Sequence, residues 1–284
     1  MPTNTIELSS PAKINLWLQI KGKRADGFHE VLTRLVKVGI ADTVSLSLLD
    51  GPPGIELSCN QPGIPTDDSN LAFKALRAFE AHADISLNWR IHLEKRIPHG
   101  AGLGGGSSNA ATVLKAANTL LKSPITDETL IEIAAGIGSD VPCFLIETSA
   151  ADGAGRGEKV TPAEFSWELP LVLIKPPFPI PTPWAYKQWS ESKELPGVLY
   201  APQLCPWGSM VNDLERPVFE KYRLLPTLKT WLLDHGSVQA ALMSGSGSTM
   251  FAITETDVQA NALAEEARRF LGDTAWIQAT RTLL

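Results

Sequence analysis

Alternating aliphatic and polar residues predict the first strand of this chain. Four aliphatic residues between positions 14 and 20 are spaced two apart, which is the period of one strand face. Lys13 and Asn15 therefore share the opposite face. The same period recurs in four further runs, at residues 36–40, 44–48, 55–59 and 85–93.

Helical spacing replaces the strand period at three places in the first half. Apolar residues three or four apart predict a helix at 70–82. A glycine-rich stretch at 98–106 leads into a second helix, for which Ser107 and Ser108 are natural N-caps. A third helix is predicted at about 126–135, with two acidic residues in its first turn, where the helix dipole favours them.

The second half of the chain predicts a different order of elements. A proline-rich stretch at 175–183 and a long polar loop separate its first strand from its first helix. The predicted strand, helix, strand, strand, helix and strand lie at residues 169–174, 211–235, 238–243, 249–254, 257–271 and 274–280. This β-α-β-β-α-β order is the ferredoxin-like arrangement. We place a boundary near residue 160 and predict an α+β fold with two domains, 1–160 and 161–284.

The distribution of charge argues against a nucleic-acid-binding protein. Of the 284 residues 20% are charged, and the formal net charge is −6 with both signs scattered along the sequence. Nucleic-acid-binding proteins normally carry a basic stripe, so no nucleic-acid partner is expected. Small phosphorylated ligands stay possible, because backbone amides bind anions without any side-chain charge.

Cysteine usage and hydropathy predict a soluble cytoplasmic protein. Cys59, Cys143 and Cys205 are far apart and odd in number, which fits neither a disulfide framework nor a metal knuckle. The first ten residues lack the order of a signal peptide. No run of about 18 apolar residues predicts a transmembrane helix, so no membrane partner is expected. The oligomeric state stays open.

The stretch from Pro98 to Ser108 is the strongest candidate for a functional site. Its six glycine or alanine residues let main-chain N–H groups converge on an anion, and the following helix adds partial positive charge. Ser107, Ser108 and Asn109 could contact phosphate or Mg²⁺. A structural turn is the alternative, but the richness in glycine before a well-formed helix favours a phosphate-binding loop.

Two known phosphate-binding motifs fit this loop poorly. A Walker A loop ends in Gly-Lys-Ser/Thr, and no lysine stands here. Residues 100–105 do satisfy G-x-G-x-x-G, with Asp127 near the spacing of a ribose contact. A dinucleotide-binding oxidoreductase is therefore the second candidate. Against it, Asp127 opens a helix instead of ending a second strand, as a Rossmann crossover requires.

Several motifs together resemble the GHMP kinase superfamily. They are SPAKINL at 10–16, RADGFHE at 24–30, GLGGGSSNAA at 102–111, GSDVP at 138–142, IPTP at 180–183 and MSGSGSTMF at 243–251. RADGFH separates the chain from homoserine and mevalonate kinases, which share the glycine loop. The chain is similar to the members that phosphorylate a cytidine-diphosphate-linked alcohol in non-mevalonate isoprenoid biosynthesis. The resemblance implies a ribosomal-protein-S5-like N-terminal domain that binds ATP, followed by the ferredoxin-like half.

The resemblance also implies catalytic roles. Asp140 matches an aspartate that receives the hydroxyl proton, and Lys13 matches a lysine that stabilises the attacking oxygen. Mg²⁺ accompanies ATP, and which loop serine contacts it stays open. Taken alone, Asp140 would be interpreted as a helix N-cap, since Pro142 suits an early helical position. The implied ATP-binding residues are Pro98, Gly100, Gly102, Leu103, Gly104, Gly105, Gly106, Ser107 and Ser108.

Five residues are candidate substrate contacts. Asn15 shares the strand face of Lys13, and His29 matches a histidine that hydrogen-bonds cytosine. Phe28 stands where these kinases more often carry tyrosine, and its ring can still stack on a base. Thr182 belongs to the IPTP segment, and Tyr186 could supply the second face of a base sandwich. Three alternatives stay open here: another GHMP kinase, the oxidoreductase, and a non-catalytic nucleotide-binding module.

Overall fold

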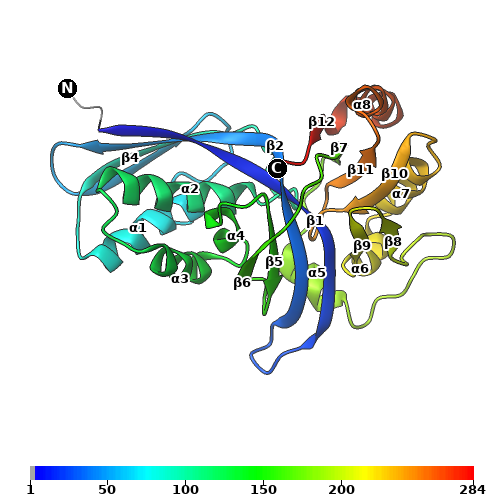
Figure 1. The fold of residues 1–284 in the computed structure, drawn as a ribbon, viewed down its shortest axis with the longest axis horizontal. Coiled ribbons are helices and arrows are strands. Elements are labelled where there is room, and N and C mark those ends of the chain that lie inside the picture. Colours follow the sequence, from blue (N-terminus) through cyan, green and yellow to red (C-terminus); the bar gives the residue numbers. More distant parts are fainter. Residues whose placement is uncertain (1–3) are drawn as a thin grey trace.

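The computed structural model describes residues 4–284, and within them the larger β-sheet has eight strands (Figure 1). They are β1 (Thr5–Lys23), β2 (His29–Leu49), β3 (Gly54–Cys59), β4 (Asn88–Glu94), β5 (Ala150–Ala154), β6 (Lys159–Ala163), β8 (Gln203–Cys205) and β9 (Gly208–Asn212). The order is β3-β4-β2-β1-β9-β8, and β5 and β6 continue the sheet beside β2. β1 and β2 form one long antiparallel pair that runs across the molecule.

The limits of three predicted strands, at 36–40, 44–48 and 85–93, differ in the structure. The runs at 36–40 and 44–48 belong to the single strand β2. The residues between them contain no turn-forming pair, so they stay paired, with Ala41 opposite Pro11. β4 begins at Asn88 and not at residue 85, since the preceding residues lie in the connection from the first helix.

Four helices belong to this part of the chain, and α1, α2 and α3 cover one face of the sheet (Figure 1). They are α1 (Leu71–Ala83), α2 (Gly105–Leu120), α3 (Asp127–Ile137) and α4 (Val141–Leu145). Asn70 and Thr126 cap α1 and α3 with their side chains. The predicted serine caps of α2 are wrong, because the N-cap is Gly104 and both serines lie in the first turn. Gly104 has φ +70°, a conformation that glycine adopts without strain.

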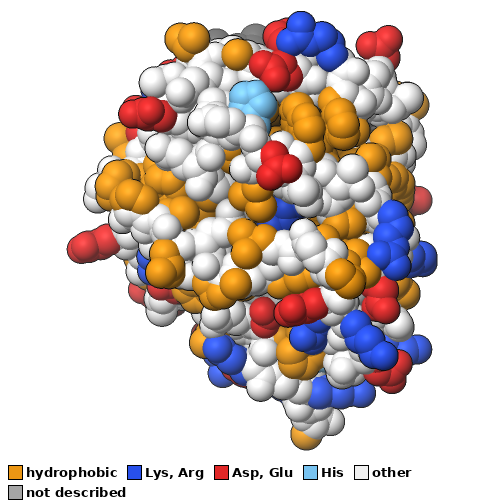
Figure 2. All heavy atoms as spheres, turned by 90° about the vertical axis from the view of Figure 1, so that its right-hand side faces the viewer, with side chains coloured by type: hydrophobic (Ala, Val, Ile, Leu, Met, Phe, Trp, Pro, Cys, Tyr) orange, Lys and Arg blue, Asp and Glu red, His pale blue; other side chains and the backbone are white. Residues whose placement is uncertain are grey.

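The smaller sheet has the ferredoxin-like order predicted from the sequence. Its strands are β7 (Pro170–Lys175), β10 (Val238–Met243), β11 (Met250–Thr254) and β12 (Trp276–Arg281), in the order β10-β11-β7-β12. All three pairings are antiparallel. Helix α8 (Asp257–Leu271) connects β11 to η1 (Gly272–Thr274) and β12. On the face formed by these C-terminal elements, acidic and basic side chains are interspersed (Figure 2).

The segment between β7 and β10 differs most from its prediction. The expected polar loop contains helix α5 (Thr182–Gln188) as well as β8 and β9. The single helix expected at 211–235 is the end of β9 followed by α6 (Glu215–Lys221) and α7 (Leu224–Leu233). Pro226 explains the break, because its ring would clash with the carbonyl of Tyr222 in a continuous helix.

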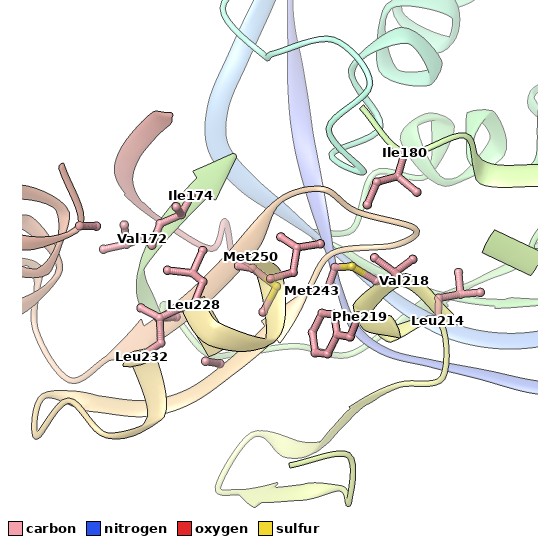
Figure 3. Close-up of a cluster of buried hydrophobic side chains, with 14 of the residues drawn as sticks. Val172, Ile174, Ile180, Leu214, Val218, Phe219, Leu228, Leu232, Met243 and Met250 are labelled. Carbon is pink, nitrogen blue, oxygen red and sulfur yellow. The ribbon is translucent and has the colours of Figure 1, made fainter. Parts of the chain in front are cut away.

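The two sheets share buried side chains. One cluster joins Leu16 of β1 and Val36 of β2 to Leu171, Leu242 and Phe251 of the smaller sheet. A second cluster lies between the larger sheet and its helices. A third packs α6, α7 and α8 against the smaller sheet, where Phe219 and Leu228 lie near Met243 and Met250 (Figure 3). The proposed boundary near residue 160 stays a prediction. Beyond that boundary, β9 pairs with β1 of the larger sheet, so the chain returns to the first half.

Candidate active site

A cleft of about 670 Å³ lies where the two sheets meet. β1 supplies its floor with Lys13 and Asn15, and the glycine loop and the start of α2 form one wall. Asp140 and the loop after β10 complete it, the latter through Gly245 and Ser246. Residues predicted from separate motifs therefore line one cavity.

The Lys13 ammonium group lies beside the Asp140 carboxylate. Nζ of Lys13 is 3.4 Å from Oδ2 of Asp140. The lysine is almost fully buried, whereas the Asp140 side chain is 35% exposed. Asp140 occupies the N-cap position of α4, but its side chain makes no capping hydrogen bond. Its carboxylate is therefore available to a molecule bound in the cleft.

Two further hydrogen bonds orient the Lys13 side chain. Nζ donates to Oδ1 of Asn15 at 2.7 Å and to the carbonyl of Gly102 at 2.9 Å. Asn15 is held in turn, because its Nδ2 donates to Oγ1 of Thr33 at 2.8 Å. The lysine thus has few rotamers open to it, and its charge stays next to the cleft.

The loop after β10 packs directly on the glycine loop. Oγ of Ser244 donates to the Gly102 carbonyl at 2.9 Å. Ser246 and Thr182 share a hydrogen bond of 2.7 Å between their hydroxyl groups. Asn212 also fixes this loop, because its Nδ2 donates to the carbonyls of Met243 and Gly245. No pattern in the sequence indicates a role for Asn212.

A buried polar network lies behind the glycine loop. Lys95 forms an ion pair with Asp42, and its Nζ also donates to Asn109 at 2.9 Å. Asn109 donates to Oγ of Ser10 at 2.9 Å, and Ser10 donates to Oγ of Ser108 at 2.8 Å. A buried ion pair is tolerated when its remaining polar atoms are hydrogen-bonded, as they are here. The network ties the start of α2 to β1 and β2.

A second cavity of about 530 Å³ adjoins the cleft and contains the predicted base contacts. The His29 ring stacks on Tyr186, with centroids 5.7 Å apart. Desolvation, followed by the nearby charge of Lys23, lowers the pKa of His29, so its ring is neutral near pH 7. Burial raises the pKa of Tyr186. Phe28 is 53% exposed and its ring does not stack on Tyr186; the guanidinium of Arg156 lies over the Phe28 ring.

Family models and related sequences both identify the family of this chain. The model of the GHMP kinases N terminal domain matches residues 70–148, and that of the GHMP kinases C terminal matches residues 205–273. The 4-diphosphocytidyl-2-C-methyl-D-erythritol kinase of Methylacidiphilum infernorum is 43% identical over 280 residues, covering 97% of this chain and 96% of that protein. This chain belongs to the 4-diphosphocytidyl-2-C-methyl-D-erythritol kinase family of GHMP kinases.

Solved structures agree with this kinase family. A crystal structure of 4-(cytidine 5'-diphospho)-2C-methyl-D-erythritol kinase is 33% identical and superposes with a TM-score of 0.80, covering 98% of this chain and 100% of that one. A homoserine kinase from Cytophaga hutchinsonii, 17% identical, has a TM-score of 0.70 over 100% of this chain and 96% of that one, which shows a shared fold alone. The predicted superfamily, α+β two-domain fold and ATP-dependent kinase activity are confirmed. The oxidoreductase and the non-catalytic module are excluded.

Several residues lining the cleft of this GHMP kinase were missed by sequence reasoning. Ile64, Pro65 and Leu71 extend the cleft beyond the glycine loop. They come from a proline-containing loop and a helix start, where no local pattern marks a binding surface. Lys95 also lines the cleft, yet in the sequence it follows a strand as a solvated lysine would.

Within residues 4–284 of this kinase, none of the helices combines the length and apolar character that crossing a membrane requires. In the same range, His, Cys, Asp and Glu side chains form no group of three that could hold a metal ion.

Proposed function

We propose that this kinase transfers the γ-phosphoryl group of ATP to the 2-hydroxyl of 4-diphosphocytidyl-2-C-methyl-D-erythritol, a step of non-mevalonate isoprenoid biosynthesis. One observation carries the proposal. The Lys13–Asp140 pair lies in a cleft that opens into a cavity lined by the rings of Phe28, His29 and Tyr186. If the base of the substrate binds in that cavity, the alcohol at the other end of the substrate can reach the Lys13–Asp140 pair.

In the proposed mechanism, the glycine loop and the N-terminus of α2 hold the ATP phosphates. Main-chain N–H groups of the loop and the helix dipole both favour negative charge. Asp140 accepts the proton of the attacking hydroxyl, and Lys13 stabilises the charge that develops on its oxygen. Phosphoryl transfer depends mostly on positioning and charge stabilisation, which two fixed, oppositely charged groups can provide.

The substrate base is proposed to lie against the aromatic rings of the second cavity. A neutral His29 can both donate and accept a hydrogen bond, as the edge of cytosine requires. Asn15 and Thr182 would contact the alcohol end, because both line the cleft and Asn15 accepts a hydrogen bond from Lys13. At the opposite end, the apolar surface of Ile64, Pro65 and Leu71 suits the adenine of ATP.

We further propose that Mg²⁺ accompanies ATP at Ser107. Mg²⁺ usually binds few protein oxygens and keeps phosphate and water ligands, so a single hydroxyl facing the cleft fits it. Ser107 lines the cleft, whereas Ser108 is fully buried and accepts the hydrogen bond of Ser10. When bound, the ion would neutralise phosphate charge.

Alanine substitutions should separate the two serines. Ser107→Ala should raise the Mg²⁺ concentration for half-maximal activity by about tenfold, the effect of one lost polar contact. Ser108→Ala should leave it unchanged but lower the free energy of unfolding by about 1–3 kcal/mol, since Ser10 loses its buried acceptor. Steady-state kinetics against Mg²⁺ and urea denaturation measure the two effects. The opposite pattern would assign the metal to Ser108.

A substrate panel tests the function itself. ADP release should require ATP together with 4-diphosphocytidyl-2-C-methyl-D-erythritol, while homoserine, mevalonate and 2-C-methylerythritol phosphate without the cytidine should release none above background. Folded protein that releases no ADP with the cytidine substrate would disprove the proposed function. Equal turnover of the other alcohols would point to a kinase without base recognition.

A reducing compartment, the cytoplasm, is also proposed for this kinase. Cys59, Cys143 and Cys205 are all free thiols. Desolvation raises the pKa of Cys143 to about 12, which makes it a packing residue without thiolate reactivity.

A further inference from the structure

The turn between β5 and β6 lies where the cleft and the second cavity meet. It has the sequence Gly-Arg-Gly-Glu at residues 155–158. Among the described residues, those that line both cavities are Ser139, Arg156, Thr182 and Tyr186. Of these four, Arg156 alone carries a permanent positive charge. A molecule that occupies both cavities must pass next to its guanidinium.

Hydrogen bonds hold this turn against the start of β2. The carbonyl of Gly155 accepts from the Val31 amide at 2.7 Å, and the Gly155 amide donates to Oε1 of Glu30 at 3.2 Å. The Arg156 amide donates to the Glu158 carboxylate at 2.6 Å. The backbone of Arg156 is thus fixed relative to His29, the first residue of β2, and to Phe28, which directly precedes that strand.

The Arg156 guanidinium has unused hydrogen-bonding capacity. It lies 4.8 Å from the centroid of the Phe28 ring, and its side chain is 37% exposed. The Glu158 carboxylate is 3.9 Å from Nε, and within residues 4–284 the guanidinium donates no hydrogen bond. Arg34 makes the contrast clear, because Asp152 accepts two of its N–H groups at 2.7 and 2.8 Å. A guanidinium with free donors can bind phosphate oxygens in pairs.

We propose that Arg156 binds the diphosphate of the nucleoside diphosphate substrate and so determines specificity for a diphosphate-linked nucleoside. The inference rests on the proposed function. In such a substrate the diphosphate lies between base and alcohol, and Arg156 lies between the second cavity and the Lys13–Asp140 pair. Of the nearby lysines, Lys23 and Lys187 line the second cavity but not the cleft, and Lys13 lines the cleft but not the second cavity.

The test compares CDP and cytidine as ligands in titrations without ATP or divalent cation. The wild-type protein should bind CDP about 10- to 100-fold more tightly than cytidine, the range for hydrogen bonds between charged groups. Arg156→Gln should reduce this preference to about twofold and raise KM for the cytidine substrate by the lost factor. KM for ATP and kcat should not change. Arg156→Lys should restore part of the preference, because it keeps the charge without the bidentate geometry.

Arg77→Gln is the matched control. Arg77 also lies over a phenylalanine ring, 5.6 Å from the centroid of Phe73, and lines neither cavity. It should keep the wild-type preference for CDP. An unchanged CDP preference in Arg156→Gln, or none in the wild type, overturns the role of Arg156. Loss of the preference in Arg156→Gln supports that role even if the wild type turns over no cytidine substrate, a result that would disprove only the proposed function.

Discussion

Asp140→Asn should lower kcat by about 100- to 10,000-fold, the usual contribution of a general base. Asparagine keeps the shape of the side chain but does not accept a proton from the substrate hydroxyl. The free energy of unfolding should change by only about 1 kcal/mol, since the carboxylate is partly exposed and caps no backbone N–H group. Single-turnover kinetics and urea denaturation measure both effects on the same preparation.

A true helix cap provides the control for Asp140. Thr256 caps α8, accepting from the Gln259 amide in a reciprocal capping box, and it lies outside the cleft. Thr256→Ala should lower the free energy of unfolding by about 0.5–2 kcal/mol and leave kcat unchanged. Should Asp140→Asn behave like Thr256→Ala, with lost stability and near-normal kcat, Asp140 is a structural cap and the proposed mechanism is wrong.

Gly102→Ala should impair both stability and activity. A Cβ atom at this position would lie 2.2 Å from the Ser244 carbonyl oxygen, and the backbone has φ +76°. Overpacking and the left-handed conformation together should lower the free energy of unfolding by about 2–4 kcal/mol. The Ser244 loop and the glycine loop would have to separate. A displacement of about 1 Å at a phosphate-binding loop can lower kcat/KM by about 100-fold.

Gly197→Ala separates the two causes. Gly197 has the same φ of +76°, but a Cβ there would meet nothing within 4 Å. It should lose only the conformational part, about 1–2 kcal/mol, with normal kinetics. Urea denaturation and steady-state assays of both variants decide the matter. Equal, mild effects at the two glycines would mean that the Ser244 loop does not pack on Gly102 in solution.

The proposed site lies at the junction of the two sheets. Lys13 comes from the larger sheet, whereas Ser244 and Gly245 follow β10 of the smaller one. The core shared by both sheets keeps the two halves in register. Substitutions at the glycine loop should therefore also weaken the contact between the halves.

Patterns among residues close together in the sequence predicted many of the helices and strands and the glycine loop. Strand and helix periods depend on residues close together in the chain, so the periods alone predict β1, α1, α2, α8 and the ferredoxin-like order. The glycine loop could be recognised from the sequence because main-chain N–H groups bind the anion, and glycine has no side chain to cover them. Lys13 and Asp140 could be proposed only from the motif resemblance, since a strand lysine and a residue before a helix have ordinary structural explanations.

Tertiary structure alone decided which distant groups meet. The fold brings Lys13 of β1 to Asp140 at the start of α4, and the β5–β6 turn brings Arg156 to Phe28. The start of α2 at Gly105 sets the helix phase, which turns Ser107 to the cleft and Ser108 inward. Such contacts depend on burial and on how whole sheets dock, and no window of neighbouring residues contains that information.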